Sequence, residues 1–111
     1  MGSSQKRGHY RLEYPVSDRP SVLINGQQYE MIDVSEQGLK FKCNNSITPD
    51  RNSPFKGKVF FKDGKSFDVS GTVLRYDPEQ DQCVVLLTKG IPLAKMIEEQ
   101  LLLIRKYKGQ Q

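Results

Sequence analysis

The stretch SVLINGQQYEMIDV, residues 21–34, contains the pattern that decides the fold. Two apolar-rich runs flank Asn25-Gly26, a dipeptide that readily takes the positive φ angles of a tight two-residue turn. The pattern therefore predicts an antiparallel hairpin. A second hairpin of the same kind is predicted at Asp63-Gly64, which separates KGKVFF from KSFDVSGTVLRY.

Further strands follow from alternation and from turn residues. The segment GLKFKC alternates strictly, with an apolar face of Leu39, Phe41 and Cys43 and a polar face of Lys40 and Lys42. Gly71, inside the longest strand, predicts a bulge or a bend. Pro78 marks a turn before QCVVLL, and residues 44–54 form the one long loop.

The period changes to that of a helix over about residues 92–108. One face of this helix carries Leu93, Met96, Ile97, Leu101, Ile104 and Tyr107, and we expect it to pack on the barrel or on a partner. About six antiparallel strands joined by tight turns predict a mainly all-β fold, a six-stranded antiparallel barrel with a C-terminal α-helix. We expect residues 1–10 to be a flexible N-terminal segment and residues 11–109 to form the barrel domain with its helix.

The composition suits a soluble globular chain, with 36% hydrophobic and 27% charged residues in 111. No apolar run approaches the roughly 20 residues of a membrane span, so we expect no membrane insertion. The opening MGSSQKRGHY lacks the apolar segment of a secretory signal, which favours a cytoplasmic location. The net charge of +4 indicates an anionic partner without identifying it.

The sequence offers little for catalysis or for metal binding. Cys43 and Cys83 each lie in an apolar strand pattern and are interpreted as buried small side chains. One histidine and no paired cysteine motif argue against a metal site. Neither a nucleophile–base pair nor a cofactor motif is recognisable, so we expect no enzyme and no cofactor.

Two arginines four residues apart stand just before the first alternating strand, in QKRGHYR, residues 5–11. The guanidinium of Arg7 or Arg11 can hold a phosphate, or O6 and N7 of guanine, with two parallel hydrogen bonds. By itself the spacing is also typical of a solvated basic terminus.

A second motif, DVSEQGLKF, lies where one predicted strand ends and the next begins. The carboxylate of Asp33 can accept hydrogen bonds from guanine N1–H and N2–H2. Ser35 offers a hydroxyl to a phosphate or to the turn itself, and Gly38 permits a positive φ and close approach of a ligand. The alternative interpretation is an ordinary turn closed by the Asp and Ser side chains.

Together, in this order, the two motifs resemble the signature of the PilZ domain family, receptors for bis-(3′-5′)-cyclic dimeric GMP (cyclic di-GMP). The signature reads R-x3-R followed by [D/N]-x-S-x2-G, and the similarity continues through GTVLRYD and CVVLL. The resemblance implies the same barrel with a C-terminal helix, and a ligand held by Arg7, Arg11, Asp33, Ser35 and Gly38. Weaker candidates for ligand contact are Lys6, Gly8, His9 and Arg75.

The resemblance implies a bacterial second-messenger receptor whose arginine segment wraps the ligand against the barrel. Such a receptor would signal in trans to a protein effector that the sequence does not name; family outputs include motility and biofilm control. One alternative is a PilZ-like protein adaptor that binds no nucleotide. Another is a small basic barrel for single-stranded nucleic acid. We disfavour the latter and expect no nucleic-acid partner, because the aromatic residues needed for stacking are predicted to lie in the core: Phe41, Phe60, Phe61 and Phe67.

Overall fold

Asn25 and Gly26 adopt positive φ angles of 50° and 83° in the computed structural model, which describes residues 11–108. They join strand β2 (Ser21–Ile24) to strand β3 (Gln27–Ser35), which pair antiparallel. Positive φ at both central residues matches the right-handed twist of the flanking strands. The hairpin predicted from the opening stretch is confirmed.

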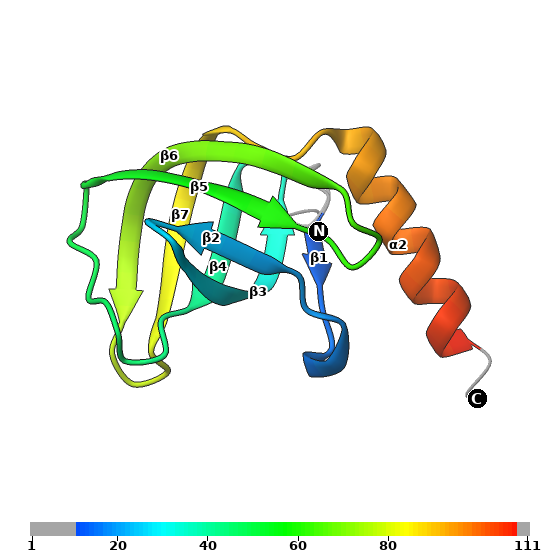
Figure 1. Ribbon diagram of the computed structural model, residues 1–111, viewed down its shortest axis with the longest axis horizontal. Coiled ribbons are helices and arrows are strands. Elements are labelled where there is room, and N and C mark those ends of the chain that lie inside the picture. The colour runs from blue at the N-terminus through cyan, green and yellow to red at the C-terminus, as the bar shows by residue number, and fades with distance from the viewer. Residues whose placement is uncertain (1–10, 109–111) are drawn as a thin grey trace, which may run out of the picture.

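The remaining strands close a ring around the core. The described chain also contains β1 (Arg11–Glu13), a 3-10 turn η1 (Val16–Asp18), β4 (Gly38–Lys42), β5 (Pro54–Phe60), β6 (Ser66–Asp77), β7 (Gln82–Lys89) and helix α2 (Leu93–Lys108). The strands run β3–β2–β5–β6–β7–β4, and β4 pairs with β3 again (Figure 1). Every pairing is antiparallel, so the predicted six-stranded barrel with a C-terminal helix is confirmed. Strand β1 is an additional strand, which pairs with the C-terminal part of β3.

The second hairpin is present, but its turn differs from the predicted one. Gly64 has a φ of 93°, whereas Asp63 does not have a positive φ. The N–H of Gly64 donates to the carbonyl of Phe61, and the Asp63 side chain accepts the N–H of Lys65 at 3.0 Å. The loop is therefore longer than the predicted two-residue Asp-Gly turn, and the Asp63 side chain helps to close it.

Gly71 produces the bend expected within β6. The pairing of β6 with β7 shifts register between Ser70 and Gly71, and the strand arches over the barrel (Figure 1). A Cβ atom at Gly71 would lie 2.0 Å from the carbonyl oxygen of Leu86. Only a residue without a side chain allows the two backbones to approach this closely.

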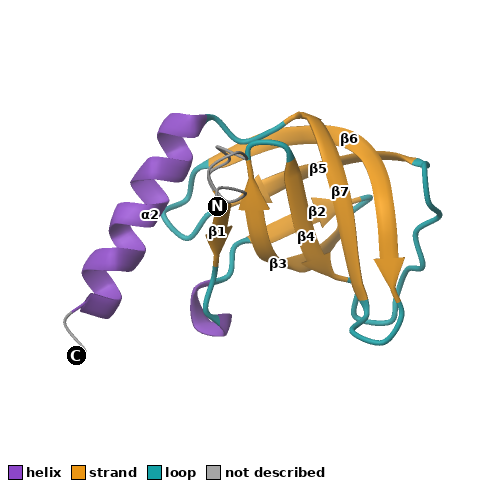
Figure 2. Cartoon of the chain, turned by 180° about the vertical axis from the view of Figure 1, so that it is seen from behind, coloured by secondary structure: helices purple, strands orange, loops and turns teal. Residues whose placement is uncertain are grey.

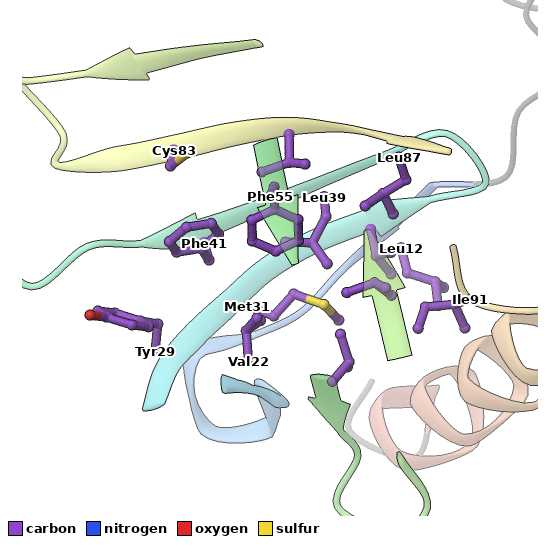
Figure 3. Close-up of a cluster of buried hydrophobic side chains, with 14 of the residues drawn as sticks. Leu12, Val22, Tyr29, Met31, Leu39, Phe41, Phe55, Cys83, Leu87 and Ile91 are labelled. Atoms are coloured by element: carbon purple, nitrogen blue, oxygen red, sulfur yellow. The ribbon is translucent and has the colours of Figure 1, made fainter. Parts of the chain in front are cut away.

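The barrel interior is filled by apolar side chains from every strand (Figure 3). The ring of Phe41 lies with its centroid 5.7 Å from that of Tyr29 and 5.9 Å from that of Phe55. Cys43 and Cys83 are fully buried, as predicted, and burial raises the pKa of the Cys83 thiol to about 12. These thiols are therefore packing residues.

Phe60 departs from the expected core. Its neighbours Val59 and Phe61 point inward, so alternation along the chain turns Phe60 outward, where it is 36% exposed. The other three phenylalanines of the predicted core do contribute to it, and Phe67 is partly buried against the rest.

Helix α2 buries only part of the face that we expected to pack on the barrel or on a partner. Of the six residues on the predicted face, Met96 is fully buried and Tyr107 half-buried. The other four are exposed: Leu93, Ile97, Leu101 and Ile104. The buried face instead carries Lys95 and Glu99, which are 4% and 7% exposed.

Charged contacts explain this orientation. The Lys95 ammonium lies 2.5 Å from Asp63, 3.3 Å from Glu98 and 3.2 Å from Glu99. Glu99 also accepts the hydroxyl of Tyr14 at 2.8 Å. Near the other end of the helix, Asp18 of η1 pairs with Lys106 at 2.5 Å and accepts the Tyr107 hydroxyl.

The helix is thus fastened near both ends by charged and polar groups, with one long side away from the barrel (Figure 2). Burying charges is tolerated because each carboxylate or ammonium finds a partner of opposite sign. Within residues 11–108, no helix is long and apolar enough to cross a membrane.

Candidate functional site

The β3–β4 hairpin holds the second motif. Strand β3 ends at Ser35 and β4 begins at Gly38, so only two residues connect them. A register shift between Met31 and Asp33 bulges β3 just before the turn. Bulges of this kind re-aim a side chain. Beyond the bulge, Asp33 lies directly opposite Lys40 of β4.

Asp33 is the centre of a small charged cluster. Its Oδ2 atom lies 3.4 Å from Nη2 of Arg11 and 3.6 Å from Nζ of Lys40. Arg11 reaches it because β1 pairs with the same half of β3, with Arg11 opposite Ser35. The Asp33 side chain is only 10% exposed, whereas that of Arg11 is 57% exposed. One nearly buried carboxylate therefore lies beneath two cations, one of which faces solvent.

Ser35 and Gly38 lie beside this cluster, in the row of the sheet that includes Arg11. The Ser35 hydroxyl accepts the backbone N–H of Gln37 at 3.4 Å, which is the turn-closing role considered above. Gly38 does not use the positive φ that a glycine permits, because the chain reverses before it and Gly38 is already in an extended strand.

Gly38 nevertheless leaves space on the outer surface. A Cβ atom there would meet the Ser35 hydroxyl and the carbonyl of Val85 at 3.5 Å, an ordinary contact distance. The fold therefore has room for a side chain at Gly38, so packing alone does not require glycine at this position. Its missing side chain opens the surface between Ser35 and the exposed Leu86 of β7, its cross-strand partner.

Comparison with known proteins extends over nearly the whole chain. A family model of the PilZ domain matches residues 5–107, which include both motifs. The chain belongs to the PilZ domain family. No curated protein matches it in sequence.

A solved structure of similar fold is the Bacillus subtilis inhibitor of motility (MotI/DgrA), with a TM-score of 0.65 and 12% sequence identity. The match covers 84% of this chain and 50% of that one, so the PilZ chain spans about half the length of its structural neighbour. At this identity the similarity shows a common fold.

Lys40 is a member of the Asp33 cluster that was not among the predicted site residues. It was interpreted as one of two lysines on a solvated face, yet its ammonium lies 3.6 Å from Asp33. The position of Lys40 could have been inferred from the register of the β3–β4 hairpin. A two-residue turn at Glu36-Gln37 necessarily pairs Ser35 with Gly38 and Asp33 with Lys40.

Arg75 is the one weaker candidate within the described residues, and it is not brought to Asp33. Arg75 lies opposite Val84 on β7, and Val84 lies opposite Lys40 on β4. Arg75 is therefore in the same row as Asp33 but three strands away, a separation of about 14 Å. Lys6, Arg7, Gly8 and His9 lie outside the described residues, as does the segment 1–10 that we expected to be flexible.

Two hollows mark the two ends of the barrel. One, of about 360 Å³, runs between β1 and α2 and is lined by Arg11, Leu12, Leu103, Tyr107 and their neighbours. The other, of about 210 Å³, is lined by Ile47, Phe55, Cys83 and nearby residues at the far mouth, and contains none of the predicted site residues. In the described part of the chain, no three side chains are placed to hold a metal ion.

Proposed function

We propose that this protein is a cytoplasmic receptor for cyclic di-GMP. The observation that carries the proposal is the nearly buried carboxylate of Asp33 beneath Arg11 and Lys40, beside the open surface over Gly38. PilZ domain proteins are receptors or adaptors rather than enzymes.

The cluster has the chemistry that a guanine and a phosphate require. A carboxylate can accept both N1–H and N2–H2 of a guanine edge, a donor pair that adenine lacks. The Arg11–Asp33 contact is long, at 3.4 Å, the Arg11 side chain faces solvent, and Asp33 keeps Lys40 at 3.6 Å as a second cation. Arg11 can therefore leave Asp33 for a phosphate at small cost, while Asp33 turns to the base.

The N-terminal arginine motif completes the proposed site. Arg7 supplies a second guanidinium fork, Gly8 lets the segment wrap, and Lys6 and His9 lie next to the ligand. Binding orders this segment over the barrel and presents a new surface to a protein partner in trans. Because the structural neighbour is an inhibitor of motility, components of the motility machinery are the first partners to test.

The test is titration calorimetry with cyclic di-GMP. Arg7→Ala and Arg11→Ala should each weaken binding by at least about 2 kcal/mol, the loss of a charge-assisted contact. Without ligand, the free energy of unfolding should change by less than roughly 0.5 kcal/mol. The same runs report how many ligand molecules bind.

Two lysines of β4 provide a matched control. Lys40→Ala should weaken binding, whereas Lys42→Ala, two residues farther along the same strand, should leave it unchanged. A folded double arginine variant that binds like the wild type would overturn the receptor proposal. A folded wild-type protein that binds no cyclic di-GMP would instead favour the adaptor alternative.

A further inference from the structure

Helix α2 presents an apolar stripe away from the barrel. Four residues with successive spacings of four, four and three lie along one side of it. Such spacing keeps side chains on one face of an α-helix. The stripe consists of Leu93, Ile97, Leu101 and Ile104, which are between 41% and 50% exposed.

The helix cannot bury this stripe by rolling on the barrel. Rolling would pull Lys95 away from Asp63 and Glu99, and Lys106 away from Asp18. Figures 1 and 2 show the helix standing beside the barrel with its outer side uncovered by other described segments. A contiguous exposed apolar patch of this kind is typical of an interaction surface.

Two charged residues beside the apolar stripe indicate which partner would fit it. Glu98 and Arg105 are seven residues apart, two helical turns, so they lie on the same flank. The acidic residue is in the first half of the helix and the basic residue in the second. The Glu98 side chain is 45% exposed, with Lys95 at 3.3 Å and Lys65 at 3.5 Å on its barrel side.

This arrangement is self-complementary in one orientation. If a second copy of the helix packs antiparallel, with its Ile104 facing Leu101, Glu98 of each copy lies beside Arg105 of the other. The ion pair then forms twice about a two-fold axis. In a parallel pair the two-fold axis would run along the helices and place the Glu98–Arg105 flanks of the two copies on opposite sides of the interface, so neither ion pair would form.

We propose that α2 is a self-association surface through which two copies of this chain pair antiparallel. The interface combines the apolar stripe with the two Glu98–Arg105 ion pairs. It is distinct from the proposed ligand site and goes beyond the receptor function. A dimer would present two ligand sites to one partner.

Sedimentation equilibrium of the full chain tests this directly. The wild-type protein should shift from one to two copies between about 1 µM and 1 mM, the range of small interfaces. Arg105→Glu and Glu98→Arg should each weaken the dimer at least about tenfold, because like charges then face each other. Mixed one to one, these two variants should dimerise again, since each supplies the charge that the other needs.

Adjacent leucines provide the matched control. Leu101→Glu should abolish the dimer, whereas Leu102→Glu, 44% exposed but outside the stripe, should leave it intact. Thermal melts check that each variant is folded, and the affinity of Leu101→Glu for cyclic di-GMP should equal that of the wild type. A wild-type monomer throughout the range, or charge variants that neither weaken the dimer nor restore it on mixing, would overturn the proposal, even if the stripe bound another protein.

Discussion

At the scale of single residues, Asp33 is the group on which the proposed recognition of guanine depends. Its side chain is 10% exposed and its Oδ2 atom lies 3.4 Å from Arg11 and 3.6 Å from Lys40. A nearly buried carboxylate of this kind is costly to leave without a donor.

The role of Asp33 leads to a prediction about selectivity. Adenine offers no donor at N1 and none at C2, so cyclic di-AMP would leave the Asp33 carboxylate unpaired. We expect it to bind more weakly than cyclic di-GMP by on the order of 3 kcal/mol or more. Calorimetry with both ligands measures the difference.

Asp33→Ala should narrow that difference, because the variant lacks the group that discriminates between the bases. Equal affinities of the wild-type protein for the two ligands would show that Asp33 serves the hairpin and not the base. Tight binding of generic single-stranded DNA, steeply dependent on salt, would favour the nucleic-acid alternative.

The candidate site was predictable from the sequence only as far as strand register could be inferred. Arg11 and Asp33, 22 residues apart, meet because β1 pairs with β3. The position of Lys40 became evident only when the hairpin register placed it opposite Asp33.

At the scale of elements, turns and strands were predictable because their signals are local. Asn25-Gly26 and the bend at Gly71 are determined by residues adjacent in sequence or by the absence of a side chain. The docked face of α2 was not predictable from hydropathy. It depends on Lys95 meeting Asp63, 32 residues away, and on Glu99 meeting Tyr14, 85 residues away.

The Lys95 cluster should therefore be a main determinant of stability. Burial alone would lower the pKa of Lys95, but hydrogen bonds to Asp63, Glu99 and Glu98 outweigh it and raise that pKa, so the ammonium stays charged. Lys95→Met would leave Asp63 and Glu99 without a cationic partner. We expect a loss of about 2–3 kcal/mol in the free energy of unfolding, measured by urea denaturation.

Lys65→Met is the matched control for Lys95→Met. Lys65 pairs with Glu98 at 3.5 Å, but its side chain is 57% exposed. Exposed ion pairs contribute little, so the variant should lose no more than about 0.5 kcal/mol. Equal losses in the two variants would contradict the idea that burial makes the Lys95 cluster important.

Low pH should weaken the attachment of α2 to the barrel at both ion pairs, Lys95–Asp63 and Lys106–Asp18. Hydrogen bonds from Lys95 lower the pKa of Asp63, and hydrogen bonds from Lys106 and Tyr107 lower the pKa of Asp18. Because both folded-state values lie below the ordinary value, the stabilisation is complete above about pH 4 and is lost as pH falls through the folded-state pKa values. Thermal melts from neutral to acidic pH should show this fall. In Asp63→Asn the loss of thermal stability at acidic pH should be smaller than in the wild type. A pH profile identical to that of the wild type would contradict the role of the Lys95–Asp63 pair.

At the scale of the whole molecule, the proposed ligand site and the helix meet at one end of the barrel. Arg11 belongs to the Asp33 cluster and also lines the hollow between β1 and α2. A ligand that draws Arg11 away from Asp33 therefore changes the wall of that hollow. Arg11 and Lys40 supply positive charge at this end of the barrel, which favours an anion there.

Limited proteolysis can measure the proposed ordering of the arginine segment. Residues 1–10 include little apolar side chain to bury, and Lys6, Arg7 and Arg11 repel one another until an anion binds. A ligand with two phosphates removes this repulsion and gives both guanidinium groups partners, so binding should order the segment. Trypsin should then cut after Lys6, Arg7 and Arg11 markedly more slowly with saturating cyclic di-GMP. Cutting after Lys106 and Lys108, at the far end of α2, should change little. If calorimetry shows binding but the N-terminal sites are cut equally fast with and without ligand, the segment is not the switch and the signal leaves through another surface.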